Sequence, residues 1–342
     1  MNKIGICGHY GGSKICLDGQ TIKTKIITEE LEKIYKIKKV DTFNGKKRII
    51  KILFNLLLLL KNCENVIILP AHNSLKIFVP FLIFFNKIFN RKLHYIVIGG
   101  WLLEYISKRK YLEKSLKKFN YIYVETSMMK ISLEKQGFKN IIIMPNCKKL
   151  KTLHENELIY NISKPYKLCT FSRVIKEKGI EDAIEAVKFI NEKLKEEIYT
   201  LDIYGQIDEN YRENFEKVMK KTPESIQYRG MISYGDSVDV LKNYLALLFP
   251  THYYTEGIPG TIIDAYAAGI PVIFSFWENY KDIIIENETG LGYEFENIDR
   301  LKETLERIIF QVEKLNSMKI RCLKEVKNYS PEEIIKILIK NL

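Results

Sequence analysis

A chain of 342 residues with 46% hydrophobic and 28% charged side chains is long enough for two domains and too apolar to be intrinsically disordered. Its net charge of +12 is unevenly divided, since residues 1–150 hold 28 Lys and Arg against 10 Asp and Glu, whereas the rest hold 26 against 32. Unless this reflects only a lysine-rich composition, the first half is expected to face a membrane surface, a phosphate-bearing lipid or a nucleic acid.

The chain begins with an apolar run that glycine interrupts (residues 1–6, MNKIGI), so the charged and apolar regions of a signal peptide are missing. We therefore expect a cytoplasmic protein, with the inner face of the cell membrane as a further location. The cysteines have no Cys-x-x-Cys spacing and are expected to be reduced core thiols. They are Cys7, Cys16, Cys63, Cys147, Cys169 and Cys322.

Short β-branched runs alternate with helical patterns in the first half, which predicts βαβ units and a parallel sheet. Strands are expected at residues 3–7, 39–43, 66–69, 95–98, 121–124 and 141–144, with helices at 21–34 and from Ser127, as a cap, to Gly137. Two very apolar stretches, 49–60 and 75–89, are shorter than the roughly 20 residues of a membrane span and are expected to be buried helices.

A polar segment at residues 148–164 has no clear period and is the expected linker. The strand and helix pattern then resumes, with strands at 167–171, 199–204, 245–249 and 271–274 and helices at 180–194 and 261–268. We therefore predict an α/β protein with two Rossmann-like, doubly wound parallel-sheet domains facing a central cleft. The expected parts are residues 1–150, 151–325 and a C-terminal helix at 326–342 that packs back on the first domain.

In open parallel sheets, ligands bind beyond the carboxyl ends of the strands. The loop at residues 171–179 follows a predicted strand and places Arg173 and Lys178 five residues apart. Both cations can converge on one anion, and a nucleoside diphosphate that leaves a sugar gains negative charge for them to stabilise. An ordinary solvated loop is the alternative interpretation.

A second loop leads into a short helix within residues 256–272, where Pro259 favours the first turn and Gly269 the end. Unpaired backbone N–H groups at the start of such a helix attract phosphate, and neighbouring glycines allow close approach. Glu256 before the helix and Asp264 about one turn inside it can accept hydrogen bonds from the hydroxyls of a sugar. Their alternatives are a cap and an ordinary acid on the helix surface.

Together these features resemble the GT-B fold glycosyltransferases of family 4, retaining enzymes that build capsular and cell-envelope polysaccharides. The similarity covers nearly the whole chain. Residues 256–272 look like the family's paired-acid signature, and Arg173 and Lys178 match its diphosphate-binding pair in spacing and position. This chain has Asp264 where the family has a second glutamate, which weakens the assignment of that residue.

The resemblance implies that Arg173, Lys178 and Glu256 are catalytic, with Glu256 on the hydroxyls of the transferred sugar and Asp264 on the ribose. The donor-binding set that it implies is Gly19, Arg173, Lys178, Glu256, Gly257, Ile258, Pro259, Gly260, Thr261 and Asp264.

An acceptor side is expected in the first half, where related enzymes often carry a histidine that this chain replaces with Gly99-Gly100-Trp101. His72 is the substitute candidate, although a structural role is its alternative, and no catalytic histidine is assigned. The expected acceptor-side residues are Gly11, Gly12, His72 and Gly100.

The function implied is transfer of a hexose from a nucleoside-diphosphate sugar to a saccharide or polyprenyl-linked acceptor, with retention, in surface polysaccharide biosynthesis. Peripheral contact with an anionic membrane is expected as well. No Asp-x-Asp pair occurs, so neither a metal nor another cofactor is expected. The alternatives are a GT-B sugar-nucleotide epimerase and a basic nucleic-acid-binding protein. Because the chain has no DNA or RNA motif, we expect no nucleic-acid partner.

Overall fold

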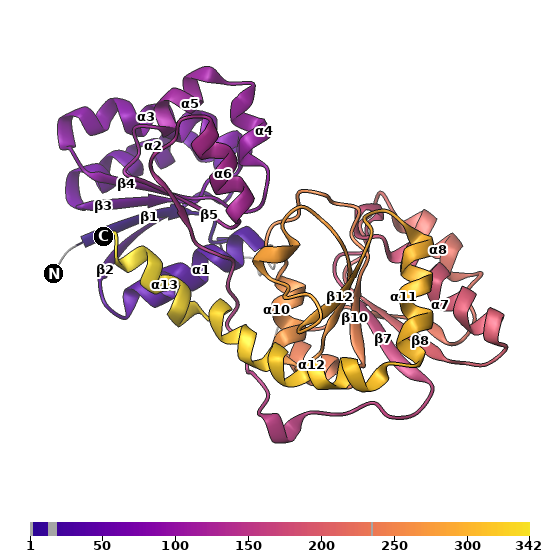
Figure 1. Cartoon of the computed structure of the whole chain (residues 1–342). Helices are drawn as coiled ribbons and strands as arrows, with labels where there is room; N and C mark the ends of the chain where they lie inside the picture. The colour runs from indigo at the N-terminus through magenta and orange to yellow at the C-terminus, as the bar shows by residue number, and fades with distance from the viewer. Residues whose placement is uncertain (1–2, 13–18, 234) are drawn as a thin grey trace. The chain divides into compact units, whose positions relative to one another are not determined.

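The computed structural model describes residues 3–12, 19–233 and 235–342 (Figure 1). Contacts divide the chain into two units, the first comprising residues 1–149 and 329–342 and the second residues 150–328. Each unit contains one six-stranded sheet, and all the pairings between neighbouring strands are parallel. The prediction of an α/β protein with two parallel sheets is therefore confirmed.

The sheet of the first unit has the strand order β2-β1-β3-β4-β5-β6. Its strands are β1 (Lys3–Gly8), β2 (Lys36–Asp41), β3 (Asn65–Ile68), β4 (Lys92–Ile96), β5 (Tyr121–Val124) and β6 (Ile141–Ile143). Its helices are α1 (Gly19–Glu32), α2 (Gly45–Asn62), α3 (His72–Phe89), α4 (Leu102–Ser107), α5 (Lys110–Leu116), α6 (Ser127–Lys135) and α13 (Pro331–Ile339). Both faces of β1 are buried, since Ile4, Ile6 and Cys7 are at most 1% exposed, as expected for a parallel strand covered by helices on both sides.

Helix α13 packs against α1 within the first unit (Figure 1). Ser330 caps it by accepting a hydrogen bond from the backbone N–H of Glu333, and Pro331 occupies its first turn. The buried side chains of Ile334 and Leu338 join the core beneath the sheet. The end of the chain therefore belongs to the same core as its beginning.

The sheet of the second unit has the order β12-β11-β10-β7-β8-β9. Its strands are β7 (Tyr166–Phe171), β8 (Tyr199–Tyr204), β9 (Ile226–Gly230), β10 (Ala246–Phe249), β11 (Val272–Ser275) and β12 (Gly290–Tyr293). Its helices are α7 (Ile180–Leu194), α8 (Arg212–Met219), α9 (Ser237–Leu241), α10 (Gly260–Ala267), α11 (Ile298–Ile309) and α12 (Val312–Glu325). Helix α7 packs with α11, while α10 packs with α9 and α12.

Several local predictions require correction. Strands β2 and β4 each begin three residues before their predicted starts, and β9 and β12 were not predicted. The cap of α6 is Thr126, whose hydroxyl accepts from the N–H of Met129, whereas Ser127 is already the first helical residue. The apolar stretches form helices α2 and α3, but neither helix is fully buried. Ile50 on α2 is 82% exposed and Phe84 on α3 is 63% exposed, because each helix covers the sheet with only one side.

The five cysteines within the described ranges are all free and buried, and the expectation for Cys16 falls on a residue outside those ranges. Across the described part of the chain, no helix is both long and apolar enough to cross a membrane.

Candidate functional site

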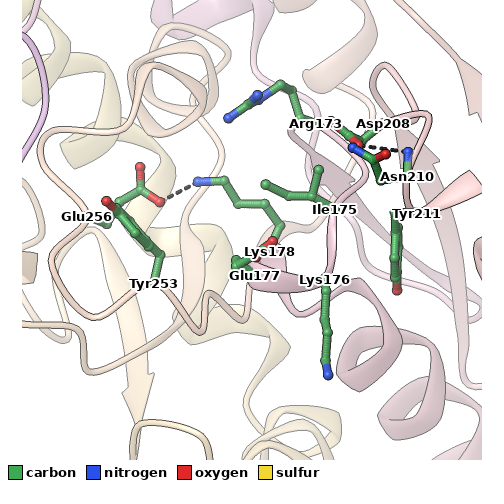
Figure 2. A pocket seen from close by; sticks show the side chains of 10 residues that line it. All are labelled: Arg173, Ile175, Lys176, Glu177, Lys178, Asp208, Asn210, Tyr211, Tyr253 and Glu256. Atoms are coloured by element: carbon green, nitrogen blue, oxygen red, sulfur yellow. Dashed lines mark hydrogen bonds and ion pairs between the residues drawn. The ribbon is translucent and has the colours of Figure 1, made fainter. Parts of the chain in front are cut away.

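A pocket of about 560 Å³ lies in the second unit, beyond the carboxyl ends of β7, β8 and β10 (Figure 2). Three of the residues predicted from the sequence line it, namely Arg173, Lys178 and Glu256. The full lining is Arg173, Ile175, Lys176, Glu177, Lys178, Asp208, Asn210, Tyr211, Tyr253 and Glu256. Its position is the one at which open parallel sheets bind ligands.

The loop that carries Arg173 is hydrogen-bonded to the loop that follows β8. The N–H of Val174 donates to the carbonyl of Gln206 at 2.8 Å, and the N–H of Asp208 donates to the carbonyl of Val174 at 3.1 Å. Gly205 permits this contact, because a Cβ there would lie 1.7 Å from the carbonyl oxygen of Ser172. Two strand-to-helix loops are thus held together as one wall of the pocket.

The 3₁₀ turn that carries Lys178 (Lys176–Lys178) is attached in turn to the loop after β10. The N–H of His252 donates to the carbonyl of Glu177 at 2.9 Å. Gly179 has a φ of 63°, and a Cβ at this position would lie 1.8 Å from the carbonyl oxygen of Pro250. A glycine is needed here both for the left-handed backbone and for the close approach of the two loops.

Lys178 and Glu256 form an ion pair inside the pocket, with side chains that are only 15% and 17% exposed. The ammonium also lies 5.4 Å from the ring centre of Phe249, at the end of β10. The backbone of Glu256 is fixed as well, because its carbonyl accepts from the side-chain amide of Asn279 at 2.7 Å. The Lys178 ammonium and the backbone of Glu256 therefore each have a contact outside the pair.

Arg173 differs from Lys178 in its surroundings. Its side chain is exposed, and no ion pair joins it to a carboxylate within the described ranges. Figure 2 shows the side chains of Arg173 and Lys178 extending in the same direction, towards the side of the pocket on which Glu256 lies. The pocket thus offers one unpaired guanidinium and one paired ammonium to an anion, together with a carboxylate that can accept hydrogen bonds from hydroxyl groups.

The predicted donor-binding residues that follow Glu256 do not line the pocket, and they lead into helix α10. Pro259 precedes the helix as its N-cap residue and Gly269 follows it with a φ of 64°, so the predicted short helix is confirmed. The hydroxyl of Thr261 donates to the carbonyl of Phe171 at the end of β7. Gly257, Ile258 and Pro259 are buried, whereas Gly260 and Thr261 are partly exposed.

Asp264 is 1% exposed, and its carboxylate accepts a hydrogen bond from the hydroxyl of Ser237 at 2.9 Å. The lining of the pocket does not include it. Its side chain therefore lies in the interior near the start of α9, and the contact with a ribose stays a prediction.

Three predicted glycines lie near the start of the first unit. Gly11 and Gly12 follow β1 with positive φ, and the N–H of Gly12 donates to the carboxylate of Asp41 at 3.0 Å. Gly19 is the first residue of α1, and among the described residues beyond its chain neighbours and its own helix backbone a Cβ at this position would meet no atom within 4 Å. Their roles in binding stay predictions.

His72 begins α3 and belongs to an aromatic cluster at the carboxyl ends of β3 and β4. Its ring centre lies 3.7 Å from that of Trp101, and its carbonyl accepts from the hydroxyl of Tyr105 at 2.6 Å. Partial burial, together with the nearby Arg109 guanidinium, lowers the pKa of His72 below its usual value. Gly100 directly precedes the tryptophan of this cluster.

Four residues of the pocket lining lie outside the two segments that the sequence singled out, 171–179 and 256–272. Asp208, Asn210 and Tyr211 come from the loop after β8, and Tyr253 comes from the loop after β10. The signal was available for the first three, because their loop also follows a strand, which is the rule that singled out Arg173. Their residue types alone suggested no chemistry.

Part of the second unit is similar to known proteins in sequence. Residues 155–322 match the family of glycosyl transferases, group 1. This group 1 segment spans most of the second unit and includes the whole pocket. The capsular polysaccharide biosynthesis glycosyltransferase CapM of Staphylococcus aureus is 28% identical over 142 residues, which are 40% of this chain and 35% of that protein. The chain thus matches little more than a third of the length of that relative.

Solved structures resemble the whole chain in fold. The Anabaena protein Alr3699/HepE, crystallised with UDP-glucose, superposes with a TM-score of 0.75 at 11% identity over 99% of this chain and 100% of that one. Sucrose-phosphate synthase of Thermosynechococcus elongatus gives 0.74 at 13% identity over 99% and 98%. The chain has the GT-B fold.

Proposed function

We propose that this chain is a glycosyltransferase that binds a nucleoside-diphosphate sugar in the pocket of the second unit and transfers the sugar to a saccharide or polyprenyl-linked acceptor. The observation that carries the proposal is the shared pocket of Arg173, Lys178 and Glu256, within a segment that matches the group 1 family. A guanidinium and an ammonium suit a diphosphate, and a carboxylate suits the hydroxyls of a sugar.

In the proposed reaction, the hydroxyl oxygen of the acceptor forms a bond to the anomeric carbon while the bond from that carbon to the diphosphate oxygen breaks. The electron pair leaves with the diphosphate, whose growing charge Arg173 and Lys178 stabilise. Attack from the face that the diphosphate leaves would give retention, with the acceptor proton passing to a phosphate oxygen. Because the two cations can stabilise the charge of the leaving diphosphate, we propose that the reaction needs no metal.

The remaining donor contacts are assigned on the same basis. We propose that Glu256 binds hydroxyls of the transferred sugar and that Asp264, oriented by Ser237, binds the ribose. Backbone groups of Gly257, Ile258, Pro259, Gly260 and Thr261 would meet the sugar and the phosphates. Gly19 is proposed to contribute to the same donor.

The acceptor is proposed to bind the first unit near Gly11, Gly12, His72 and Gly100. The name of CapM supports a glycosyltransferase of surface polysaccharide biosynthesis, and the paired acids of residues 256–264 support glycosyltransferase family 4. We propose that the transferred sugar is a hexose. A lipid-linked acceptor would place the enzyme against the anionic inner face of the cell membrane.

A panel of nucleoside-diphosphate sugars tests this proposal. Donors are first ranked by the rise in melting temperature of the chain in EDTA, since a ligand at about a hundred times its dissociation constant stabilises by roughly 2.7 kcal/mol. The best donor is then incubated with and without saccharide acceptors, and the products are identified by mass spectrometry and NMR. We expect the transferred sugar to keep the anomeric configuration, α or β, that it has in the donor. We also expect product only when an acceptor is present. Conversion of the donor sugar into its epimer without any acceptor would refute the transferase.

A further inference from the structure

Helix α2 has apolar side chains on its outward side as well as on the side that faces the sheet. Ile52 and Leu56 are at most 3% exposed and pack in the core of the first unit. Ile50, Phe54 and Leu58 are 82%, 60% and 38% exposed. A spacing of four residues places these three along one side of the helix. The helix therefore presents an apolar stripe to solvent, which its role in the core does not require.

Helix α3, which packs beside α2, repeats this arrangement (Figure 1). Phe78 and Leu82 are at most 1% exposed and face the core. Ile77, Phe84 and Ile88 are 43%, 63% and 73% exposed, and spacings of seven and four residues place them along one side of the helix. Two adjacent helices thus expose large apolar side chains, and such patches are typical of binding surfaces.

The charges on these helices are all positive. Neither α2 nor α3 contains Asp or Glu. Three exposed lysines directly adjoin exposed apolar residues in the sequence, since Lys51 follows Ile50, Lys76 precedes Ile77 and Lys87 precedes Ile88. None of these lysines forms an ion pair with a carboxylate in the described part of the chain. The cations of the two helices are Lys46, Lys47, Arg48, Lys51, Lys61, Lys76 and Lys87.

Apolar side chains interspersed with unpaired cations match the boundary between the headgroups and acyl chains of an anionic bilayer. Phenylalanine and isoleucine side chains enter the acyl boundary, while lysines extend their ammonium groups to the lipid phosphates. A nucleic acid would use the lysines but would leave the apolar stripes in water. The combination therefore favours lipid.

We propose that α2 and α3 form a membrane-docking surface for bilayers that contain anionic phospholipids. This docking surface consists of Ile50, Phe54, Leu58, Ile77, Phe84 and Ile88 with the lysines beside them. The inference builds on the proposed function, because it identifies the part of the enzyme that would meet the membrane holding a lipid-linked acceptor.

Vesicle sedimentation of the full chain tests the docking surface without donor or acceptor. One vesicle type is phosphatidylcholine alone, and the other contains about a third phosphatidylglycerol. At about 0.05 M salt, we expect the phosphatidylglycerol vesicles to bind the chain at least tenfold more tightly. Raising the salt to about 0.5 M should weaken this binding severalfold while leaving a residual apolar component.

Two double variants separate the apolar and the charged contributions. Phe54→Ser with Phe84→Ser should weaken binding to the anionic vesicles by at least about tenfold. Lys51→Glu with Lys87→Glu should weaken it by a similar factor and also remove the preference for phosphatidylglycerol. The matched controls come from exposed residues of the second unit. Phe310→Ser (86% exposed) and Lys220→Glu should change binding by less than about twofold.

Equal binding to both vesicle types, or equal losses in the controls and the docking-surface variants, would overturn the proposal. So would a dimer, detected by analytical ultracentrifugation, that Phe54→Ser with Phe84→Ser dissociates while the original chain fails to bind vesicles. The surface would then join two copies of the chain. Since the assay contains no sugar donor, a negative result leaves the transferase proposal to be judged by its own test.

Discussion

The two units build similar parallel sheets but differ in the outer faces of the helices that cover them. In the second unit, α7 and α11 are joined by ion pairs of 2.7 Å between Lys302 and Glu185 and between Lys193 and Glu306. The exposed ring of Phe189 lies under both lysines. In the first unit, α2 and α3 carry cations without any acid. Because the fold depends on the inner faces of these helices, the outer faces are free to serve binding.

Buried cations differ between the units as well. In the first unit, Lys23 donates to the carboxylate of Glu125 at 2.5 Å, and the two side chains are 2% and 5% exposed. In the second unit, the fully buried Lys319 donates to the carbonyl of Tyr244 at 3.1 Å. A carboxylate compensates the first ammonium, whereas in the described part of the chain only a backbone carbonyl bonds to the second. Removing the charged partner of Lys23 should therefore destabilise the chain, and removing the Lys319 ammonium should stabilise it.

Glu125→Gln should have the largest effect on stability. It leaves the Lys23 ammonium buried beside a neutral amide, and breaking a buried ion pair in this way costs about 3–5 kcal/mol. Urea unfolding followed by Trp101 fluorescence in a Trp277→Phe background would report the first unit alone. The control is Glu104→Gln in an exposed pair with Lys108, expected to change the free energy of unfolding by less than about 0.5 kcal/mol. A similar loss in both variants would contradict the role of the buried pair.

Arg173→Ala and Lys178→Ala should each reduce turnover by at least about a hundredfold with the donor found by screening, because each removes a charge that stabilises the leaving group. Lys178→Arg should recover part of the lost activity. The double variant Phe54→Ser with Phe84→Ser changes the docking surface of the first unit and leaves the pocket of the second unit intact. It should therefore retain turnover with a water-soluble acceptor. Near-normal turnover in both alanine variants would refute the assignment of the cations.

Lys319→Met should stabilise the second unit. Burial lowers the pKa of Lys319 from its ordinary 10.5 to about 8, so the folded chain binds this proton more weakly than the unfolded chain does. Burying the charged lysine therefore lowers the free energy of unfolding by about 3 kcal/mol below pH 8, and this loss of stability disappears as the pH rises towards 10.5. The variant should therefore gain about 2 kcal/mol at pH 7, after loss of one hydrogen bond, and its advantage should vanish near pH 10.5.

Chemical denaturation at several pH values, followed by Trp277 in a Trp101→Phe background, measures this gain. Lys324→Met, in an exposed position on the same helix, is the control and should be neutral at every pH. A pH-independent difference between Lys319→Met and the original chain would contradict the explanation by burial.

Substitutions in the docking surface should have the smallest effect on the stability of the chain. Phe54→Ser and Phe84→Ser each alter a side chain that is at least 60% exposed, so the free energy of unfolding should change by less than about 0.5 kcal/mol. Leu56→Ala, on the buried side of α2, should cost about 2–5 kcal/mol and is the contrast. A loss above about 2 kcal/mol in either serine variant would show that these rings support the fold.

Most strands and several helices could be predicted because their pattern is local, but β9 and β12, the edge strands of the second sheet, were not predicted. Alternation of β-branched strands with helical periods was sufficient for β5 and α7, whose observed bounds equal the predicted ones. The prediction that α2 and α3 are buried helices was wrong for their outer sides, because apolar composition does not reveal how much of a helix the sheet can cover. Sequence alone cannot separate the covered side of Leu56 from the open side of Phe54, since both residue types suit a core.

The pocket was predictable in part for a related reason. Arg173, Lys178 and Glu256 follow strand ends, and parallel strands bring such ends to one edge of the sheet. The contacts that hold them required tertiary structure, such as the approach of Gly179 to Pro250 and the amide of Asn279 on Glu256. The buried position of Asp264 could not be foreseen either, because a helix exposes or buries a residue according to its neighbours.

Calorimetric titration of nucleoside diphosphates in the presence of EDTA tests the central claim most directly. The account predicts that at least one of the common diphosphates binds the chain without a metal, and that Arg173→Ala with Lys178→Ala weakens this binding by at least about tenfold. Lys220→Ala, outside the pocket, should bind as the original chain does. Binding that requires a divalent metal, or that survives removal of both cations unchanged, would contradict the account.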